Sequence, residues 1–201
     1  MKIIGRHAFK NSKIKEIDIP KGVTKLDICA FAYSDLERIS LPDTLKVIRA
    51  YAFSNCKNLT ELTIPKSVAD IDTGAFEALP KCVLTILNEC DDRKVFRISD
   101  DAFAFGQKKA DIKEVRVPYG SVAMRCAMKA GLNVTTFPCD PRKFGNPKKY
   151  YYLDDVFCCE GSTLHEYFGL QDIVHVPKGI RTIGKSAFEF SKGKKVYLPV
   201  L

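Results

Sequence analysis

A short alternation of apolar and polar residues recurs along the chain, and each copy ends in proline. The copies share the form apolar, any residue, apolar, proline, and they are Ile17–Pro20, Ile39–Pro42, Leu62–Pro65, Val115–Pro118, Val174–Pro177 and Val196–Pro199. Alternate side chains of an extended strand point to opposite faces, so each copy predicts a short strand with one buried face. Proline ends the strand because its nitrogen cannot donate a hydrogen bond to a neighbouring strand.

The dipeptide Ala-Phe recurs in phase with this alternation. Its copies are Ala8-Phe9, Ala30-Phe31, Ala52-Phe53, Ala75-Phe76, Ala102-Phe103 and Ala187-Phe188. The first four copies are 22, 22 and 23 residues apart, and the prolines at positions 20, 42 and 65 keep the same spacing. Two landmarks that recur together predict an internal repeat of 22 or 23 residues.

Further apolar positions surround the Ala-Phe dipeptide in each repeat. Two apolar residues three apart precede it, as Val23 and Leu26 do, and both can point into one core. A mostly small residue stands three positions after the phenylalanine and favours a tight turn, although Leu79 departs from this rule. The phenylalanines are predicted to stack along the core, and they are Phe9, Phe31, Phe53 and Phe76.

A repeat of this length cannot bury its own apolar face, so it must stack on the next repeat. The stacked strands would align into a parallel sheet, and the inward residues would be Ile17, Ile19, Ile39, Leu41, Leu62 and Ile64. The pattern therefore predicts a solenoid.

The repeat resembles the BspA-type leucine-rich repeat, also called the bacterial surface antigen type. Val68–Phe76 and Ile180–Phe188 are similar to the first half of that repeat, and Asn55–Pro65 is similar to its second half. The resemblance covers about residues 3 to 118 and again about 160 to 199. It implies an α/β repeat fold, namely a leucine-rich-repeat solenoid that forms a right-handed superhelix with one short parallel strand in each coil.

The resemblance also implies a class of function without naming a partner. Proteins with similar repeats are mostly binding proteins and adhesins of microbial surfaces, and the repeats carry no catalytic residues. The implied function is a non-catalytic protein–protein interaction module at a microbial surface or host interface. The alternative is a structural or self-associating scaffold, or a fragment of a longer solenoid, because the first repeat lacks a polar cap and the last strand stops at residues 199–201.

The repeat is irregular in the middle of the chain. The step from Phe76 to Phe103 is 27 residues, Lys81–Val95 contains no strand-ending proline, and Gly106–Asp111 has the character of an insertion. These departures predict a solenoid that is loosened at this point.

The predicted strands that end in proline are called prolyl strands below. A different local pattern follows the fourth of them, Val115–Pro118. Residues 121–130 predict a short helix, with Ser121 as its N-terminal cap and Gly131 as its stop, and a short strand over 134–137. We therefore expect a repeat block at 1–137, a basic connection rich in proline, glycine and tyrosine at 138–152, and a second repeat block at 153–201 that continues the same solenoid. Two subdomains divided near residue 140 are the alternative.

The outward residues of the predicted strands form an exposed ladder, which is the usual binding surface of a solenoid. By alternation the ladder consists of Glu16, Asp18, Arg38, Ser40, Glu61, Thr63, Glu114, Arg116, Ile173, His175, Lys195 and Tyr197. Its last part, with Ile173, His175 and Tyr197, predicts a more adhesive patch because aromatic groups favour interfaces. The alternative is that the ladder only solvates the sheet.

Charge favours no specific polyanion as a partner. The formal net charge is +8, but the 32 lysines and arginines are spread along the chain. A basic run at 142–149 followed by Tyr150, Tyr151 and Tyr152 could hold phosphates and stack bases, yet a solvated linker explains the same residues. We therefore predict no specific nucleic-acid partner.

The cysteines and histidines give little support to catalysis or metal binding. The eight cysteines contain no Cys-x-x-Cys pair and are expected to be mostly reduced, and no known motif surrounds His7, His165 or His175. Cys158, Cys159 and His165 contain good zinc ligands, but their spacing fits no standard structural site. We expect no enzyme activity, cofactor or metal.

Two observations bear on localisation. No stretch is apolar enough to span a membrane, and residues 1–9 are too short and polar for a signal-peptide core. Together with the reduced cysteines this favours the cytoplasm, whereas the family resemblance favours the cell surface or secretion.

Overall fold

The structure is a computed structural model, and its described residues form two compact units, Met1–Pro138 and Cys139–Leu201. The described residues are 2–88, 96–106, 110–118, 120–137, 151–153, 157–167, 171–185, 187–188 and 194–198. The expectation that the second unit continues the solenoid of the first stays a prediction.

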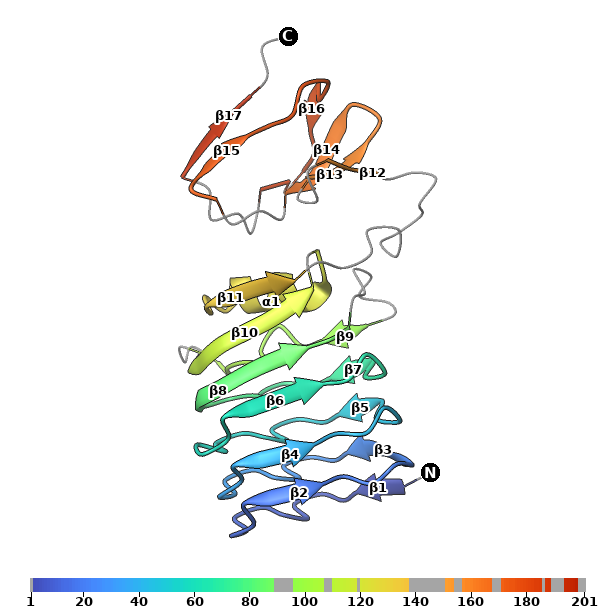
Figure 1. Cartoon of the computed structure of the whole chain (residues 1–201), viewed down its shortest axis with the longest axis vertical. Coiled ribbons are helices and arrows are strands. Elements are labelled where there is room, and N and C mark those ends of the chain that lie inside the picture. Colours follow the sequence, from blue (N-terminus) through green and yellow to red (C-terminus); the bar gives the residue numbers. More distant parts are fainter. Residues whose placement is uncertain are drawn as a thin grey trace. The chain divides into compact units, whose positions relative to one another are not determined.

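The first unit consists of short strands and one helix (Figure 1). The strands are β1 (Lys2–Ile4), β2 (Glu16–Asp18), β3 (Val23–Leu26), β4 (Arg38–Ser40), β5 (Val47–Ile48), β6 (Glu61–Ile64), β7 (Asp70–Ile71), β8 (Leu79–Ile86), β9 (Arg97–Ile98), β10 (Ile112–Pro118) and β11 (Val134–Phe137). The helix is α1 (Val122–Lys129).

Each coil of this unit carries two strands where the sequence pattern predicted one. The predicted strands lie in the parallel pair β2-β4 and in the parallel sheet β11-β10-β8-β6. A second parallel sheet, β1-β3-β5-β7-β9, is built from the apolar pairs that precede Ala-Phe. The unit is thus a parallel β-solenoid with two strand-bearing faces.

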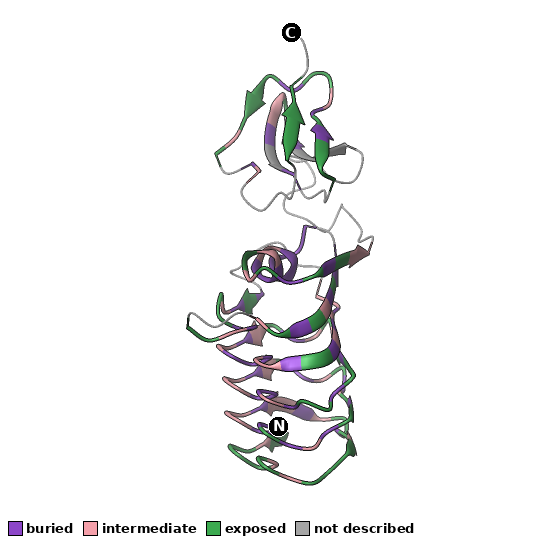
Figure 2. Cartoon of the chain, turned by 90° about the vertical axis from the view of Figure 1, so that its left-hand side faces the viewer, coloured by how far each residue is buried: buried purple, intermediate pink, exposed green. Residues whose placement is uncertain are grey.

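The core lies between these faces, as the burial pattern in Figure 2 shows. The prolyl strands pair so that Ile17 faces Ile39 and Leu62 faces Leu84, which stacks like side chains from coil to coil. Ile39, Leu62 and Ile64 are buried, whereas Ile17 in the first coil is only half-buried. Because each coil covers the apolar face of the next, burial is shared between neighbours.

The phenylalanines of the Ala-Phe dipeptides stack as predicted. Ring centroids are 5.1 Å apart for Phe9 and Phe31, 5.6 Å for Phe31 and Phe53, and 6.3 Å for Phe53 and Phe76. Phe103 extends the stack at 6.0 Å with a tilted ring. Since Phe31, Phe53, Phe76 and Phe103 are at most 1% exposed, the stack forms the centre of the core.

Backbone hydrogen bonds join the segments around Ala-Phe from coil to coil. The amides of His7, Phe9 and Asn11 donate to carbonyls of the second coil at 3.0, 2.7 and 3.0 Å. The same three positions donate in the next two coil pairs, and the intervening amides donate to the carbonyl three residues earlier. Each of these segments therefore forms turns within its own coil and hydrogen bonds to the next coil.

The irregular middle keeps the solenoid register. β8 has no strand-ending proline, yet Leu62, Thr63 and Ile64 of β6 pair with residues 84, 85 and 86 of it. Parts of the two predicted irregular segments, residues 89–95 of Lys81–Val95 and residues 107–109 of Gly106–Asp111, lie outside the described residues.

The helix α1 has the predicted ends. The Ser121 hydroxyl accepts a hydrogen bond from the Met124 amide at 3.1 Å, which caps the N-terminus. Gly131, with φ +71°, follows the last turn, and the amide of Leu132 returns to the carbonyl of Ala127. These are the features of a Schellman motif, in which a residue with positive φ satisfies the last carbonyls. The helix packs on β9, β10 and β11.

The second unit combines an antiparallel meander with repeat-like strands. Its strands are β12 (Tyr151–Leu153), β13 (Phe157–Glu160), β14 (Thr163–Tyr167), β15 (Ile173–His175), β16 (Thr182–Ile183) and β17 (Lys195–Tyr197). β12, β13 and β14 pair antiparallel, whereas β14 pairs with β16 and β15 with β17 in parallel. Its core contains Cys159, Leu164, Tyr167, Val174, Val176, Ile180 and Ala187.

Candidate functional site

The structure places the predicted ladder on the outward side of the prolyl strands. In the first unit these residues lie on β2, β4, β6 and β10, and in the second unit they lie on β15 and β17. All of them are exposed except Glu114, which is half-buried. The ladder residues thus fall on two compact units, four strands in the first and two in the second.

Strand register adds residues that the sequence pattern did not include. Thr63 of β6 pairs with Thr85 of β8, Thr85 pairs with Arg116 of β10, and Arg116 pairs with Thr135 of β11. Val83 occupies the adjacent outward position of β8. The signal was present as the alternation over residues 83–86, but Leu87 stands where proline was required.

Some ladder charges are paired with each other. Arg38 donates a hydrogen bond to Glu16 on the neighbouring coil, and this contact holds the pKa of Glu16 below its usual value. Arg116 donates to Glu114 at 3.0 Å and lowers the pKa of that carboxyl, with a further hydrogen bond from Thr135. Exposed pairs of this kind contribute little to stability, because solvent screens their charges.

Other ladder side chains are neither hydrogen-bonded nor ion-paired among the described residues, although Asp18 and Arg38, and Glu61 and Arg116, attract each other electrostatically. Asp18, Ser40, Glu61 and Thr63 make no side-chain hydrogen bond or ion pair within the part of the chain that the structure describes. They lie on three neighbouring coils, on β2, β4 and β6. Their backbone positions are fixed on the β2-β4 pair and on β6, and their polar groups remain available to a ligand.

In the second unit the predicted aromatic patch is assembled. The rings of His175 and Tyr197 stack with centroids 4.9 Å apart and an interplanar angle of 10°. Ile173 and Tyr197 are each 51% exposed. Pairing of β15 with β17 also places Ile173 beside Lys195, so an apolar surface lies next to a cation.

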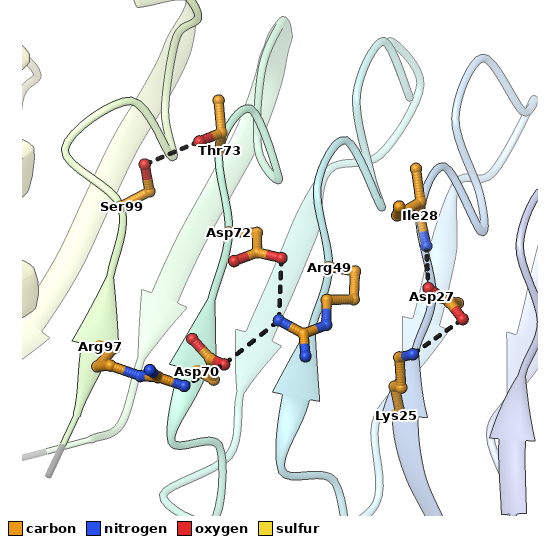
Figure 3. Close-up of polar contacts among 9 residues, drawn as sticks. All are labelled: Lys25, Asp27, Ile28, Arg49, Asp70, Asp72, Thr73, Arg97 and Ser99. Atoms are coloured by element: carbon orange, nitrogen blue, oxygen red, sulfur yellow. Dashed lines mark hydrogen bonds and ion pairs between the residues drawn. The ribbon is translucent and has the colours of Figure 1, made fainter.

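A second polar surface, which the sequence did not reveal, lies on the β3-β5-β7-β9 face (Figure 3). Parallel register sets Lys25, Val47, Asp70 and Arg97 side by side. Lys25 pairs with Asp27 at 2.9 Å, and this contact, with a hydrogen bond from the Ile28 amide, lowers the pKa of Asp27.

The centre of this surface is a network of two arginines and two aspartates. Nη1 of Arg49 lies 3.5 Å from a carboxylate oxygen of Asp70 and 3.2 Å from one of Asp72. Nη2 of Arg97 lies 2.8 Å from the same Asp70 oxygen. The network lines an open groove of about 440 Å³ together with Ile71, Thr73, Ile98 and Ser99. We call this the β7–β9 groove.

Sequence reasoning missed this groove for a physical reason. Its residues flank the apolar pairs, such as Val68 and Ile71, that the pattern assigned only to the core. Because the second strand of each coil was not predicted, neither was the alignment of its outward charges. The recurrence of charges at a step of about one repeat, as from Arg49 to Asp72, was the available signal.

The remaining chemistry-bearing residues are mostly buried or outside the described residues. Cys29, Cys56 and Cys82 are free thiols, and burial raises the pKa of Cys56 and raises the pKa of Cys82 to about 12. Of the cluster considered for zinc, only Cys159 has a described side chain, which is buried. Within the described ranges no three histidine, cysteine or acidic side chains are placed to hold a metal ion.

The basic segment considered for nucleic-acid binding lies largely outside the described residues, since the description resumes only at β12. None of the helices in the described ranges is long and apolar enough to cross a membrane.

Parallel coils of 22 or 23 residues, with stacked phenylalanines and a strand in each coil, define a leucine-rich-repeat solenoid. The chain belongs to the BspA-type leucine-rich repeat family, whose model matches six copies over residues 1–119. Repeats of this family are generally non-catalytic. Among curated proteins, none matches this chain.

Several solved structures of bacterial proteins are similar to this chain. The pneumococcal vaccine antigen PcpA is 22% identical, with a TM-score of 0.50, over 69% of this chain and 40% of that one. A leucine-rich-repeat protein of T. pallidum is 21% identical, with a TM-score of 0.45, over 70% of this chain and 64% of that one. A leucine-rich-repeat protein of Bacteroides ovatus is 20% identical, with a TM-score of 0.39, over 98% of this chain and 64% of that one. This chain therefore spans less than two thirds of each of these proteins.

Proposed function

We propose that this chain is a non-catalytic protein-recognition module that binds through the outward ladder of its prolyl strands. Family membership supports a role in protein interaction. The observation that carries the choice of surface is the set of unpartnered side chains on β2, β4 and β6, which are Asp18, Ser40, Glu61 and Thr63. A binding protein lowers the entropic cost of association when such groups are held in place before the partner arrives.

The partner we propose is another protein at a microbial surface or a host interface. The ladder offers carboxylates and hydroxyls over the first coils and the stacked pair of His175 and Tyr197 in the second unit. Aromatic side chains on a rigid sheet act as anchors, and the surrounding polar groups select the register.

Site-specific photocrosslinking tests this proposal. A photoreactive amino acid at Thr63 should capture a partner from surface-protein extracts, whereas the same group at exposed Lys66, beyond the strand end, should capture it far less. The identified partner is then titrated against purified chain in which Asp18, Glu61 and Thr63 are changed to alanine. We expect a loss of affinity of roughly tenfold or more, because truncated contacts at an interface centre commonly cost over 1 kcal/mol each.

A matched variant controls for nonspecific charge effects. Asp43→Ala and Lys66→Ala remove exposed charges away from the ladder and should leave affinity unchanged. His175→Ala with Tyr197→Ala tests the second surface separately. Equal affinity of the ladder variants and the parent for the captured partner would contradict binding through this face.

A self-associating scaffold is the second candidate. Exposed apolar side chains favour it, since Ile3 is 45% and Ile14 37% exposed in the first coil, and Leu198 is 63% exposed after β17. Light scattering over a range of concentrations, with and without reductant, separates the two. A monomer at all concentrations supports the recognition module, whereas growth with concentration supports the scaffold.

A further inference from the structure

The β7–β9 groove has properties that protein recognition by the ladder does not use. It lies on the opposite strand-bearing face of each coil, and about 440 Å³ of space opens between its side chains. This volume falls within the range of about 300 to 1,000 Å³ typical of small-molecule sites. The lining is part polar and part apolar, and its side chains carry guanidinium, carboxylate and hydroxyl groups (Figure 3).

The formal charge of the groove is balanced. Arg49 and Arg97 offset Asp70 and Asp72, and every one of these four groups is in an ion pair with a neighbour. An ionic ligand would therefore meet charges of its own sign as well as of the opposite sign in the groove. A neutral ligand carries no such penalty.

Unused hydrogen-bonding capacity remains in the network. A guanidinium has five N–H donors, and the contacts described above engage only Nη1 of Arg49 and Nη2 of Arg97. The second carboxylate oxygens of Asp70 and Asp72 are likewise without a partner among the described residues. Donors and acceptors therefore alternate over the surface of the groove.

Two hydroxyls extend this alternation at one side. Thr73 and Ser99 are hydrogen-bonded to each other at 3.0 Å, and Ser99 also accepts from the Asp101 amide at 3.2 Å. The apolar lining residues Ile71 and Ile98 are buried, so the groove presents no apolar pocket for an anchoring side chain. This composition disfavours a peptide, whose binding energy comes mainly from such anchors.

We propose that the β7–β9 groove is a binding site for a neutral saccharide. Each sugar hydroxyl is both a donor and an acceptor, so one hydroxyl can donate to an aspartate and accept from an arginine. Hydrogen bonds to charged groups are the stronger kind, and the existing ion pairs hold the groups in position before the ligand binds. The site is independent of the proposed ladder interface.

A titration followed by NMR tests the proposal on the full chain. The probes are the neutral trisaccharides maltotriose, cellotriose and chitotriose, with trigalacturonic acid and trilysine as charged comparisons, all at millimolar concentration. We expect at least one neutral trisaccharide to shift the backbone amides of residues 70–73 and 97–99 along a saturating curve. The amides of β2, β4 and β6 should stay in place.

Two surface variants and one control complete the experiment. Asp72→Ala and Arg97→Ala should each weaken saccharide binding by roughly tenfold, because each removes hydrogen bonds to a charged group. Asp18→Ala, on the other face, should bind as the parent does, and thermal melts should show that all variants are folded.

Three results would overturn the saccharide site. They are the absence of saturable shifts at residues 70–73 and 97–99 with all three neutral probes, tighter binding of a charged probe than of any neutral one, and unchanged affinity in both groove variants. Since none of them concerns the ladder, failure here leaves the proposed protein interface standing.

Discussion

Two backbone positions in each of the first four coils adopt a left-handed conformation, and they explain much of the repeat. One position directly precedes Ala-Phe and holds His7, Cys29, Tyr51 and Gly74, with φ between +54° and +62°. For a non-glycine residue this backbone conformation costs about 1 to 2 kcal/mol of conformational free energy. Here the amide of each residue donates to the next coil, which offsets that cost. Glycine is the usual sign of a left-handed position in a sequence. Since only the fourth coil has glycine here, the sequence did not reveal this conformation.

Gly74 is expected to be intolerant of any side chain. Its φ is +62°, and an added Cβ would collide with the ring of Tyr51, which lies against it. Gly74→Ala should lower the free energy of unfolding by at least about 2 kcal/mol, from backbone strain and from the collision together. Urea unfolding followed by circular dichroism measures this loss.

Gly106→Ala is the matched control for backbone strain. Gly106 also has a positive φ, of +69°, but an added Cβ meets no atom within 4 Å. This variant should lose only about 1 kcal/mol. Equal losses at the two glycines would show that the Tyr51 contact contributes nothing.

Cys82 should make stability depend on alkaline pH. Burial raises the pKa of its thiol from 9.0 to about 12. The unfolded chain loses this proton first, so the contribution is complete below pH 9 and is lost as pH rises towards 12. The free energy of unfolding should fall in this range, with up to about 1.4 kcal/mol per pH unit from this thiol.

The variant Cys82→Ala isolates that contribution. Its unfolding free energy should fall less steeply above pH 9 than that of the parent, although Cys56 and Cys159, whose pKa values burial also raises, keep part of the slope. Parallel slopes for parent and variant would rule out Cys82 as a source of the alkaline loss.

At the scale of elements, strands that end in proline were predictable and the others were not. β2, β4, β6 and β10 follow a two-residue alternation closed by proline, and α1 is marked by its serine cap and glycine stop. The strands of the second sheet are two to four residues long, too short to establish an alternation. Their pairing depends on the stacking of whole coils, and so does the β7–β9 groove.

The cap of α1 gives a prediction at this scale. The Ser121 side chain is fully buried and accepts the Met124 amide, so Ser121→Ala leaves a helix amide without its partner. The free energy of unfolding should fall by about 1 kcal/mol. Exposed Ser40 serves as the comparison, and Ser40→Ala should change stability by less than about 0.5 kcal/mol. If both variants lost the same amount of unfolding free energy, a capping role for Ser121 would be contradicted.

At the scale of the molecule, the stack of phenylalanines connects the coils of the first unit. Each ring packs against the ring of the coil before and the coil after it, so stability is shared between neighbouring coils. This arrangement was predictable because the spacing of Ala-Phe is visible in the sequence. The meander β12-β13-β14 was not predictable, because its residues carry neither the Ala-Phe dipeptide nor the strand-ending proline of the repeat.

Phe31→Ala tests the stack. Phe31 is 1% exposed and contacts the rings of Phe9 and Phe53, so we expect the free energy of unfolding to fall by roughly 3 to 5 kcal/mol. Tyr33, two residues later and 56% exposed, is the control, and Tyr33→Ala should cost under about 1 kcal/mol. An unchanged melting temperature in Phe31→Ala would eliminate the stacked core.

The hydrogen bonds between the Ala-Phe segments all run in one direction, from an amide in one coil to a carbonyl in the next. Peptide dipoles that align in this way add up, as they do in an α-helix, whereas those of paired strands largely cancel. This side of the solenoid therefore has an electrical polarity, negative at the first coil and positive at the fifth. Exposed Arg6 and Lys10 lie at the negative end, and exposed Asp101 lies at the positive end, next to Asp100, which is ion-paired with Lys129 at 2.9 Å. The Ala-Phe segments of the first unit thus carry a longitudinal dipole that runs from coil to coil.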